Sequence, residues 1–258
     1  MLEGPTIVRA ALDAAAPLEA AYVAADARRV GDLPDRLVAA GVPVRTLAAG
    51  VLERIADVVT PQGVVAVCRS VTTTLSAALT ATDPAGPGRP APFVLVGLGI
   101  GDPGNAGTMI RTADATGAAA VVLAGGADVA GPKVVRAAAG SLFHLPVVAG
   151  GKALGVGGGD GGAEVLGELG TLGFRRLGAS AGKGLACDLA DLTGPVALVV
   201  GNEAHGLPGG LPLDGLVHVP MAGRAESLNV AMAATVLCYE AARQRRAAAD
   251  ASQGRGGG

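Results

Sequence analysis

The chain has 258 residues, of which 50% are apolar and 16% are charged, and this balance excludes a wholly disordered polypeptide. The formal net charge of −2 argues against a protein that coats nucleic acid by bulk electrostatics. With three Phe, two Tyr and no Trp, the chain is also too poor in aromatic rings for a base-stacking platform. No uncharged, unbroken run reaches the roughly 18 residues of a membrane span, and the N-terminus does not resemble a signal peptide. We therefore expect no membrane association and a cytoplasmic location.

The first 70 residues predict a small α/β domain, because short helical and strand-like runs alternate along them. The runs span residues 6–15, 18–24, 32–41, 42–47, 51–57 and 64–68. Residues 71–91 are first polar and then dense in Pro and Gly, which predicts a linker. The three cysteines, Cys68, Cys187 and Cys238, have neither a disulfide framework nor zinc-site spacing, so we expect buried thiols and no metal.

A second alternating pattern over residues 92–247 predicts an α/β domain with a mostly parallel sheet. Expected strands span 93–98, 119–125, 145–148, 174–180, 195–201 and 216–221, and expected helices 105–117, 133–140, 164–173 and 227–246. The glycine-rich segment 150–162 is most simply a surface loop, and residues 248–258 a flexible tail. In the last helix, one apolar stripe is formed by Val230, Ala234, Leu237 and Ala241.

The first candidate site lies between an expected strand and a helix, where Gly99, Gly101 and Gly104 fit the GxGxxG spacing of a dinucleotide site. The match is weak in a chain with 42 glycines. A carboxylate at Asp102 would also oppose a pyrophosphate there, so a nicotinamide-dependent dehydrogenase is a minor alternative.

Polar residues near the starts of two helices and after one strand form the other candidates. Asn105 is a plausible helix N-cap, and a single helical arginine such as Arg111 is most simply solvated. Glu203 follows the strand 195–201 at its carboxyl end, where parallel sheets bind ligands, although a solvated turn explains it equally well. Ser227 and Asn229 open the last helix, and an N-cap role explains one of them but not both.

Two catalytic alternatives are weak. His205 is a tempting general base, but the sequence shows no partner for it. No GxSxG motif surrounds Ser227, and no histidine and carboxylate suggest a hydrolytic triad, so a serine hydrolase is not expected.

Taken together and in this order, NAGTMIRTADATGA, LVVGNEAHGL and VPMAGRAESLNVAMAA resemble the three motifs of the SpoU (TrmH-type) branch of the SPOUT RNA methyltransferases. The resemblance covers residues 92–246, and the first 70 residues resemble, less specifically, an L30e-like RNA substrate-binding domain. It implies a C-terminal deep trefoil knot, an exception to the rule against knots. It also implies S-adenosylmethionine as cofactor and a homodimer through the knotted domain, which the apolar stripe of the last helix would partly face.

The resemblance also implies roles for single residues. The catalytic positions would be Arg111, Asn105, Glu203, Ser227 and Asn229. The backbone of Gly201, Val219 and Leu228 would hold the cofactor, with Ala179 as a further candidate. Methylating a ribose 2′-hydroxyl requires stabilisation of the charge that develops on its oxygen, and the guanidinium of Arg111 suits that task. A general-base role for it stays open.

The function implied is that of an S-adenosylmethionine-dependent RNA ribose-2′-O-methyltransferase, with 23S ribosomal RNA as the expected substrate. A tRNA 2′-O-methyltransferase is the nearest alternative, and a non-catalytic RNA-binding or assembly protein is the rival from another class. Local arginines would hold the RNA, namely Arg28, Arg29, Arg136 and Arg224. The nucleotide that is modified, and whether the modification serves housekeeping or antibiotic resistance, stay open.

Overall fold

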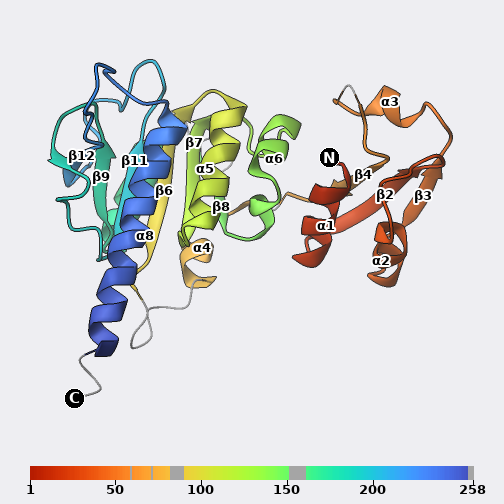
Figure 1. Ribbon diagram of the computed structural model, residues 1–258, viewed down its shortest axis with the longest axis horizontal. Coiled ribbons are helices and arrows are strands. Elements are labelled where there is room, and N and C mark those ends of the chain that lie inside the picture. The colour runs from red at the N-terminus through yellow and green to blue at the C-terminus, as the bar shows by residue number, and fades with distance from the viewer. Residues whose placement is uncertain (59, 71, 82–89, 151–160, 255–258) are drawn as a thin grey trace.

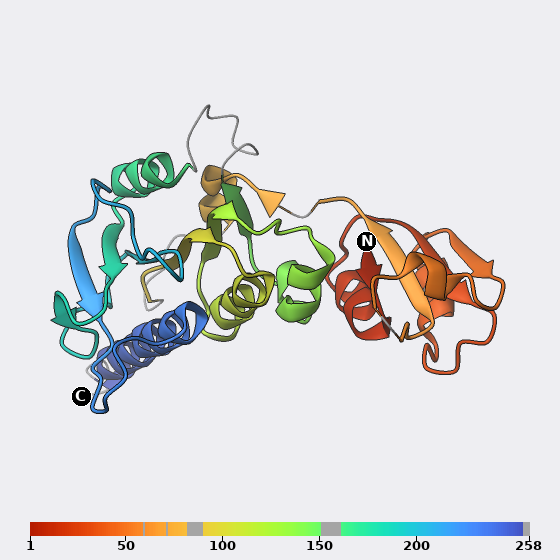
Figure 2. The same cartoon turned by 90° about the horizontal axis from the view of Figure 1, so that it is seen from above.

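The computed structural model describes residues 1–58, 60–70, 72–81, 90–150 and 161–254. A small sheet near the N-terminus and a larger sheet form two parts, and Figures 1 and 2 show the small part projecting from one end of the large one. Within the described residues, no helix is both long enough and apolar enough to span a bilayer.

The small domain is built on a sheet of strand order β1-β4-β2-β3. Its strands are β1 (Leu2–Glu3), β2 (Leu18–Ala24), β3 (Val44–Leu47) and β4 (Val64–Cys68), and its helices α1 (Pro5–Asp13), α2 (Leu33–Ala39) and α3 (Leu52–Ile55). Strand β2 pairs parallel with β3 and antiparallel with β4. Val8 of α1 and Leu33 and Leu37 of α2 are fully buried in one core with apolar side chains of the sheet. The predicted small α/β domain is thus confirmed.

The large sheet has the strand order β10-β12-β9-β11-β6-β7-β8-β5, and each neighbouring pair is parallel. The strands are β5 (Thr72–Thr73), β6 (Phe93–Ile100), β7 (Ala120–Gly126), β8 (Val147–Gly150), β9 (Arg175–Ala179), β10 (Leu185–Ala186), β11 (Val196–Val200) and β12 (Gly215–His218). Strands β6 and β11 are almost wholly buried, as their unbroken apolar runs require in a sheet covered on both faces. The predicted mostly parallel α/β sheet is confirmed.

Helices cover both faces of this sheet. One face carries α5 (Pro103–Ala115), α6 (Pro132–Ala138), the 3-10 turn η1 (Ser141–Phe143) and α8 (Val230–Gly254), and the other carries α4 (Leu75–Ala81) and α7 (Gly162–Thr171). Alternate residues of β6 divide between the two cores, because Phe93 and Leu95 pack with α5 and α8 whereas Val94 and Val96 pack with α7.

Part of the predicted linker is instead structured. Thr72 and Thr73 pair with β8 at the edge of the large sheet, and Leu75 and Ala78 of α4 are buried against its second face. A strand of two residues is too short to show an alternating pattern, so the polar composition of this stretch concealed it. Residues 82–89 of the predicted linker and 151–160 of the glycine-rich segment lie outside the described residues.

Helix α8 differs from its prediction at both ends and in its apolar stripe. It begins at Val230 and not at residue 227. It continues to Gly254, so residues 248–254 belong to the helix and not to the expected flexible tail, in keeping with the high helix propensity of their alanines. Its predicted stripe is not available to a second subunit, because Ala234, Leu237 and Ala241 are buried in the core of the same chain.

A buried ion pair connects the small domain to the large one. Glu3 of β1 is 7% exposed; its Oε2 accepts a hydrogen bond from Nη1 of Arg136 on α6 at 3.1 Å, and its Oε1 accepts one from the backbone N–H of Asp57 at 2.8 Å. Arg136 thus holds the two domains together, and its side chain remains 30% exposed, so its predicted contact with RNA stays a prediction.

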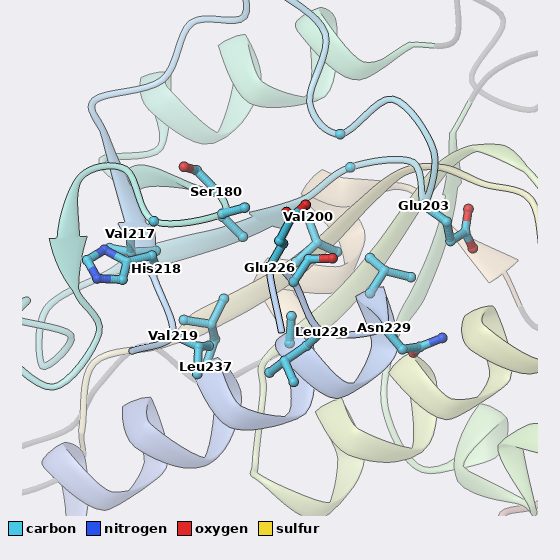
Figure 3. A pocket seen from close by; sticks show the side chains of 18 of the residues that line it. Ser180, Val200, Glu203, Val217, His218, Val219, Glu226, Leu228, Asn229 and Leu237 are labelled. Atoms are coloured by element: carbon cyan, nitrogen blue, oxygen red, sulfur yellow. The ribbon is translucent and has the colours of Figure 1, made fainter. Parts of the chain in front are cut away.

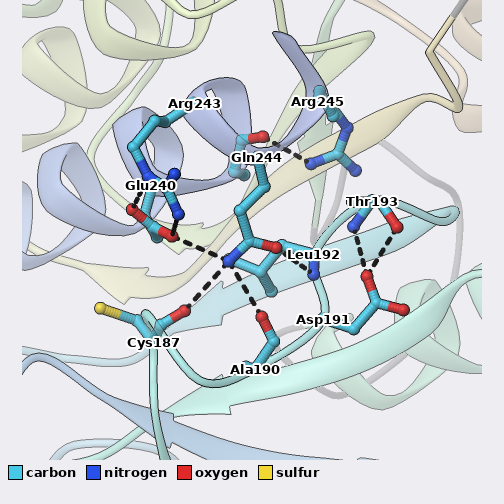
Figure 4. A network of polar contacts seen from close by, with 10 residues as sticks. Cys187, Ala190, Asp191, Leu192, Thr193, Glu240, Arg243, Gln244 and Arg245 are labelled. Carbon is cyan, nitrogen blue, oxygen red and sulfur yellow. Dashed lines mark hydrogen bonds and ion pairs between the residues drawn. The ribbon is translucent and has the colours of Figure 1, made fainter. Parts of the chain in front are cut away.

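Polar contacts from α8 hold the loop between β10 and β11 in place (Figure 4). The Gln244 amide nitrogen donates to the carbonyl oxygen of Ala190 at 3.0 Å and to Glu240 Oε1 at 2.8 Å. The Gln244 amide oxygen accepts from the backbone N–H of Leu192 at 2.9 Å. One side chain thus satisfies several polar groups that the loop would otherwise bury unpaired.

Arg245, the next residue of α8, also binds the loop between β10 and β11. It is 5% exposed, donates to the carbonyl oxygens of Ala91 at 3.1 Å and Gly194 at 2.9 Å, and stacks 4.8 Å above the centre of the Phe93 ring. Burial lowers the pKa of Arg245 to about 10, so its guanidinium remains charged at neutral pH.

Candidate functional site

Loops at the carboxyl ends of β9, β11 and β12 meet the first turns of α8 around a cavity of about 470 Å³ (Figure 3). Because the strands are parallel, these loops emerge at the same edge of the sheet, where such sheets bind ligands. The cavity is lined by residues 179–182, 200–203, 206, 217–219, 221, 226–230, 233 and 237. Segments from four separate places in the sequence thus form one site.

The structure brings the four predicted cofactor positions together at this cavity. Ala179 ends β9, Gly201 follows β11, Val219 follows β12 and Leu228 precedes α8. A glycine is required at position 201, because a Cβ there would lie 2.2 Å from the carbonyl oxygen of Gly206. The absence of a side chain lets the loop fold back on itself at the mouth of the cavity.

Three of the predicted catalytic side chains form one hydrogen-bonded chain across the motifs. The Asn105 amide nitrogen donates to Glu203 Oε1 at 2.9 Å, and the Asn229 amide nitrogen donates to Asn105 Oδ1 at 3.1 Å. Glu203 and Asn229 line the cavity, whereas Asn105 joins them from α5. The start of α5, the loop after β11 and the start of α8 are therefore locked to one another.

The carboxylate of Glu203 is held in its charged form. Burial opposes its ionisation, but the hydrogen bonds from the Asn105 side chain and from backbone amides, that of Gly101 at 3.5 Å included, outweigh burial and lower the pKa of Glu203. Glu203 is thus an acceptor that orients its neighbours, and it is poorly suited to carry a proton at neutral pH.

One of the two helix caps differs from expectation, and the other agrees with it. Helix α5 starts at Pro103 and its N-cap is Asp102, whose Oδ1 accepts from the backbone N–H of Asn105 at 2.8 Å, so Asn105 is not the cap. At α8 the cap is Asn229, whose Oδ1 accepts from the backbone N–H groups of Ala231 and Met232 at 2.9 and 3.3 Å. This arrangement leaves the hydroxyl of Ser227 at the cavity wall for another purpose.

Arg111 lies apart from this group. It is exposed on the solvent side of α5, does not line the cavity, and makes no hydrogen bond or ion pair with any residue that the structure describes. It follows Asn105 by six residues, which is about 9 Å along the helix axis. A molecule bound at Asn105 and Ser227 would have to extend over α5 to meet the guanidinium.

Several lining residues are not predicted from the sequence. His218, on the last strand before the third motif, has a buried Nδ1 atom without a hydrogen-bond partner among the described residues. Glu226 precedes Ser227 and also lines the cavity.

His205, by contrast, does not line the cavity. Its Nδ1 lies 3.1 Å from Asn202 Oδ1, a partner that the sequence pattern could not reveal. In the described ranges, no group of three or more His, Cys, Asp or Glu side chains is placed to hold a metal ion.

Comparisons with known proteins agree with this arrangement. Residues 92–239 match the SpoU rRNA Methylase family, and residues 1–74 match the family described as RNA 2'-O ribose methyltransferase substrate binding. A Bacillus subtilis (strain 168) protein named 23S rRNA (guanosine(2553)-2'-O)-methyltransferase RlmP is 34% identical over 93% of this chain and 86% of its own length. The 23S rRNA (guanosine-2'-O-)-methyltransferase RlmB of Ralstonia nicotianae is 34% identical over 84% of each chain.

A solved structure shares the fold over nearly the whole chain. The SpoU methyltransferase AviRb from Streptomyces viridochromogenes, crystallised in complex with the cofactor AdoMet, superposes with a TM-score of 0.77 at 30% identity, covering 95% of this chain and 90% of that one. On the combined evidence of sequence, fold and site, the chain belongs to the SpoU family of RNA 2′-O-ribose methyltransferases.

Proposed function

We infer that this chain transfers a methyl group from S-adenosylmethionine to a ribose 2′-hydroxyl of ribosomal RNA, 23S rRNA being the expected molecule. The observation that carries the inference is that the second and third motif segments line one cavity, while the first is hydrogen-bonded to both of them through Asn105. The relatives named as 23S rRNA methyltransferases support the choice of RNA. A substrate of this kind agrees with the expected cytoplasmic location.

The cavity fits the cofactor in size and chemistry. At about 470 Å³ it falls in the range of small-molecule sites, and it combines apolar walls at Val219 and Leu228 with a few polar groups. The buried Nδ1 of His218 lacks a partner among the described residues, and a buried polar atom of this kind is stabilised by a ligand atom that bonds it. We propose that Ala179, Gly201, Val219 and Leu228 hold the cofactor.

S-adenosylmethionine, when bound, supplies an activated methyl group on a sulfonium. The chain must then position a ribose hydroxyl and stabilise the negative charge that grows on its oxygen. We propose that the Ser227 hydroxyl positions the ribose and that the Arg111 guanidinium stabilises the oxygen, while Asn105, Glu203 and Asn229 fix the loops around them. The guanidinium suits Arg111 to this role because it is a cation that offers several N–H donors.

We propose that the protein acts as a homodimer and that its C-terminal segment is threaded into a trefoil knot. The exposed side of α8 supports the dimer, because Met232, Val236 and Tyr239 recur at helical spacing and are 49%, 39% and 50% exposed. With the exposed Met221 and Leu228 they extend the apolar surface to the cavity rim. A second copy seated there would adjoin the cavity.

RNA recognition falls, in this proposal, to the small domain together with the cavity rim. Arg28 and Arg29 are exposed on the small domain and Arg224 is exposed in the loop before α8, so these side chains are available to phosphates. Because this binding would rest on contacts between arginines and phosphates, it should weaken as salt is added.

The proposed function is tested by incubating the protein with methyl-labelled S-adenosylmethionine and either ribosomal RNA or tRNA, followed by digestion to nucleosides and mass spectrometry. We expect a 2′-O-methylated nucleoside from ribosomal RNA. Transfer to tRNA alone would reassign the substrate, and label on a base would contradict the ribose chemistry. Binding of RNA without any transfer would instead favour a non-catalytic RNA-binding protein.

A further inference from the structure

The charges around the cavity are unevenly distributed. Among the described residues that line it, two are carboxylates, Glu203 and Glu226, and none is a lysine or an arginine. Such a site favours a positively charged ligand over a neutral one of the same shape.

The two carboxylates differ in what they contact. Glu203 is engaged by the side chain of Asn105 and the backbone amide of Gly101. Glu226 makes no hydrogen bond and no ion pair with any residue of the described ranges. Figure 3 shows its side chain among those that line the cavity, between Ser180 and Leu228 in that view. Glu226 is therefore the carboxylate whose charge remains available to a ligand.

The reaction inferred above changes the charge of the cofactor. The methyl donor carries a positive charge on its sulfonium sulfur, whereas the product, S-adenosylhomocysteine, has a neutral thioether at the same place. Both molecules keep the same amino and carboxylate groups, so the charge on sulfur, together with the methyl group, distinguishes them.

We propose that Glu226 is a specificity-determining residue that makes the cavity prefer the charged methyl donor to its neutral product. The inference rests on the proposed function, since it assumes that this cavity holds the donor. The carboxylate attracts the sulfonium charge and has no comparable attraction for the thioether. After transfer, the product dissociates more readily than the donor would. A new donor molecule can then bind in the cavity.

The effect should be modest, because Glu226 is exposed and water screens its charge. A unit charge several ångströms from another in a water-filled site changes an equilibrium constant by about threefold to tenfold. We expect that range for the change in preference when the charge is removed.

The experiment is isothermal titration calorimetry of the full chain with S-adenosylmethionine and, separately, with S-adenosylhomocysteine. The variant Glu226→Gln should lose about threefold to tenfold in its preference for the donor, through weaker binding of the donor and little change for the product. Glu226→Asp, which keeps the charge, should retain most of the preference. Glu164→Gln removes the same charge from an exposed position of α7, outside the cavity, and should leave the preference unchanged.

Salt gives a second test that does not depend on a variant. Added salt should reduce the preference of the wild-type protein for the donor over the product. It should have little effect on the same preference in Glu226→Gln. An unchanged preference in a folded Glu226→Gln protein would overturn the assignment while leaving the proposed function intact. If the wild-type protein binds neither molecule, the proposed function fails, and this inference fails with it.

Discussion

At the scale of single residues, the hydrogen bonds among Glu203, Asn105 and Asn229 have a defined direction. The carboxylate accepts only, so it turns the Asn105 amide nitrogen toward itself and the Asn105 oxygen toward Asn229. The Asn229 oxygen is then left to cap α8. A single acidic side chain thereby fixes the orientation of two amides.

The direction of the hydrogen bonds among Glu203, Asn105 and Asn229 can be tested by reversing one of them. Asn105→Asp places a second carboxylate against Glu203 and should lower the free energy of unfolding at pH 7 by about 1 kcal/mol. In the wild type the lowered pKa of Glu203 adds stability that is lost as pH falls through that pKa. In the variant the pKa of the pair should be raised, so mild acidification from about pH 7 to pH 5 should stabilise it. Urea unfolding at both pH values measures the difference.

The double variant Asn105→Asp with Glu203→Gln is the control. Its new glutamine amide would donate to its new aspartate, whose second oxygen still accepts from Asn229, so both hydrogen bonds return with one carboxylate in total. We expect wild-type stability at pH 7 and no stabilisation on mild acidification. A double variant as unstable as Asn105→Asp would show that the direction of these bonds is unimportant.

Arg111 is the residue whose proposed role is least evident from a single chain, since it lies outside the cavity. Arg111→Ala should lower the rate of methyl transfer by about 100-fold or more, the usual cost of losing one group that stabilises developing charge. Donor affinity measured by calorimetry should not change. Arg111→Lys should recover part of the rate, because it keeps the charge without the planar fork of donors. Full activity in Arg111→Ala would refute the role.

At the scale of elements, the large sheet is the part that the sequence predicts best. Its central strands, such as Phe93–Ile100 and Val196–Val200, are apolar runs bounded by turns. This local pattern is sufficient to predict them as strands. Local pattern fails where a distant contact decides. Asn105 has the sequence features of a helix cap, but its side chain donates a hydrogen bond to Glu203, 98 positions away. Similarly, Thr72–Thr73 forms a strand only because it pairs with β8.

The contact between α8 and the loop before β11 gives an element-scale prediction. Gln244→Leu removes the partner of the Leu192 amide and of the Ala190 carbonyl, and should lower the free energy of unfolding by about 1–3 kcal/mol. Arg246→Leu, an exposed change two residues later on the same helix, should cost little. Urea unfolding compares the two variants. Equal effects would mean that the Gln244 contacts contribute nothing specific.

At the scale of the whole molecule, one side of α8 is an apolar surface that a single chain leaves uncovered. The predicted stripe, Ala234, Leu237 and Ala241, is buried within the chain, and the exposed set of Met232, Val236 and Tyr239 lies on the other side of the helix. Periodicity alone could not choose between two apolar stripes on one helix, because both have helical spacing.

A charge on this exposed surface should separate the proposed dimer. Val236→Arg buries an unpaired cation at the interface, and should shift the protein from dimer to monomer in analytical ultracentrifugation. Leu172→Arg, which places the same charge at an exposed apolar residue beside α7, should leave the mass unchanged. A wild-type protein that sediments as a monomer would contradict the dimer outright.

The residues that line the cavity all fall between positions 179 and 237. During synthesis, the preceding two thirds of the chain can emerge and fold without creating any place for the cofactor. On the proposed assignment of this cavity to the methyl donor, recognition begins only after the start of α8 has left the ribosomal exit tunnel. A nascent chain arrested before that point should be unable to retain the donor.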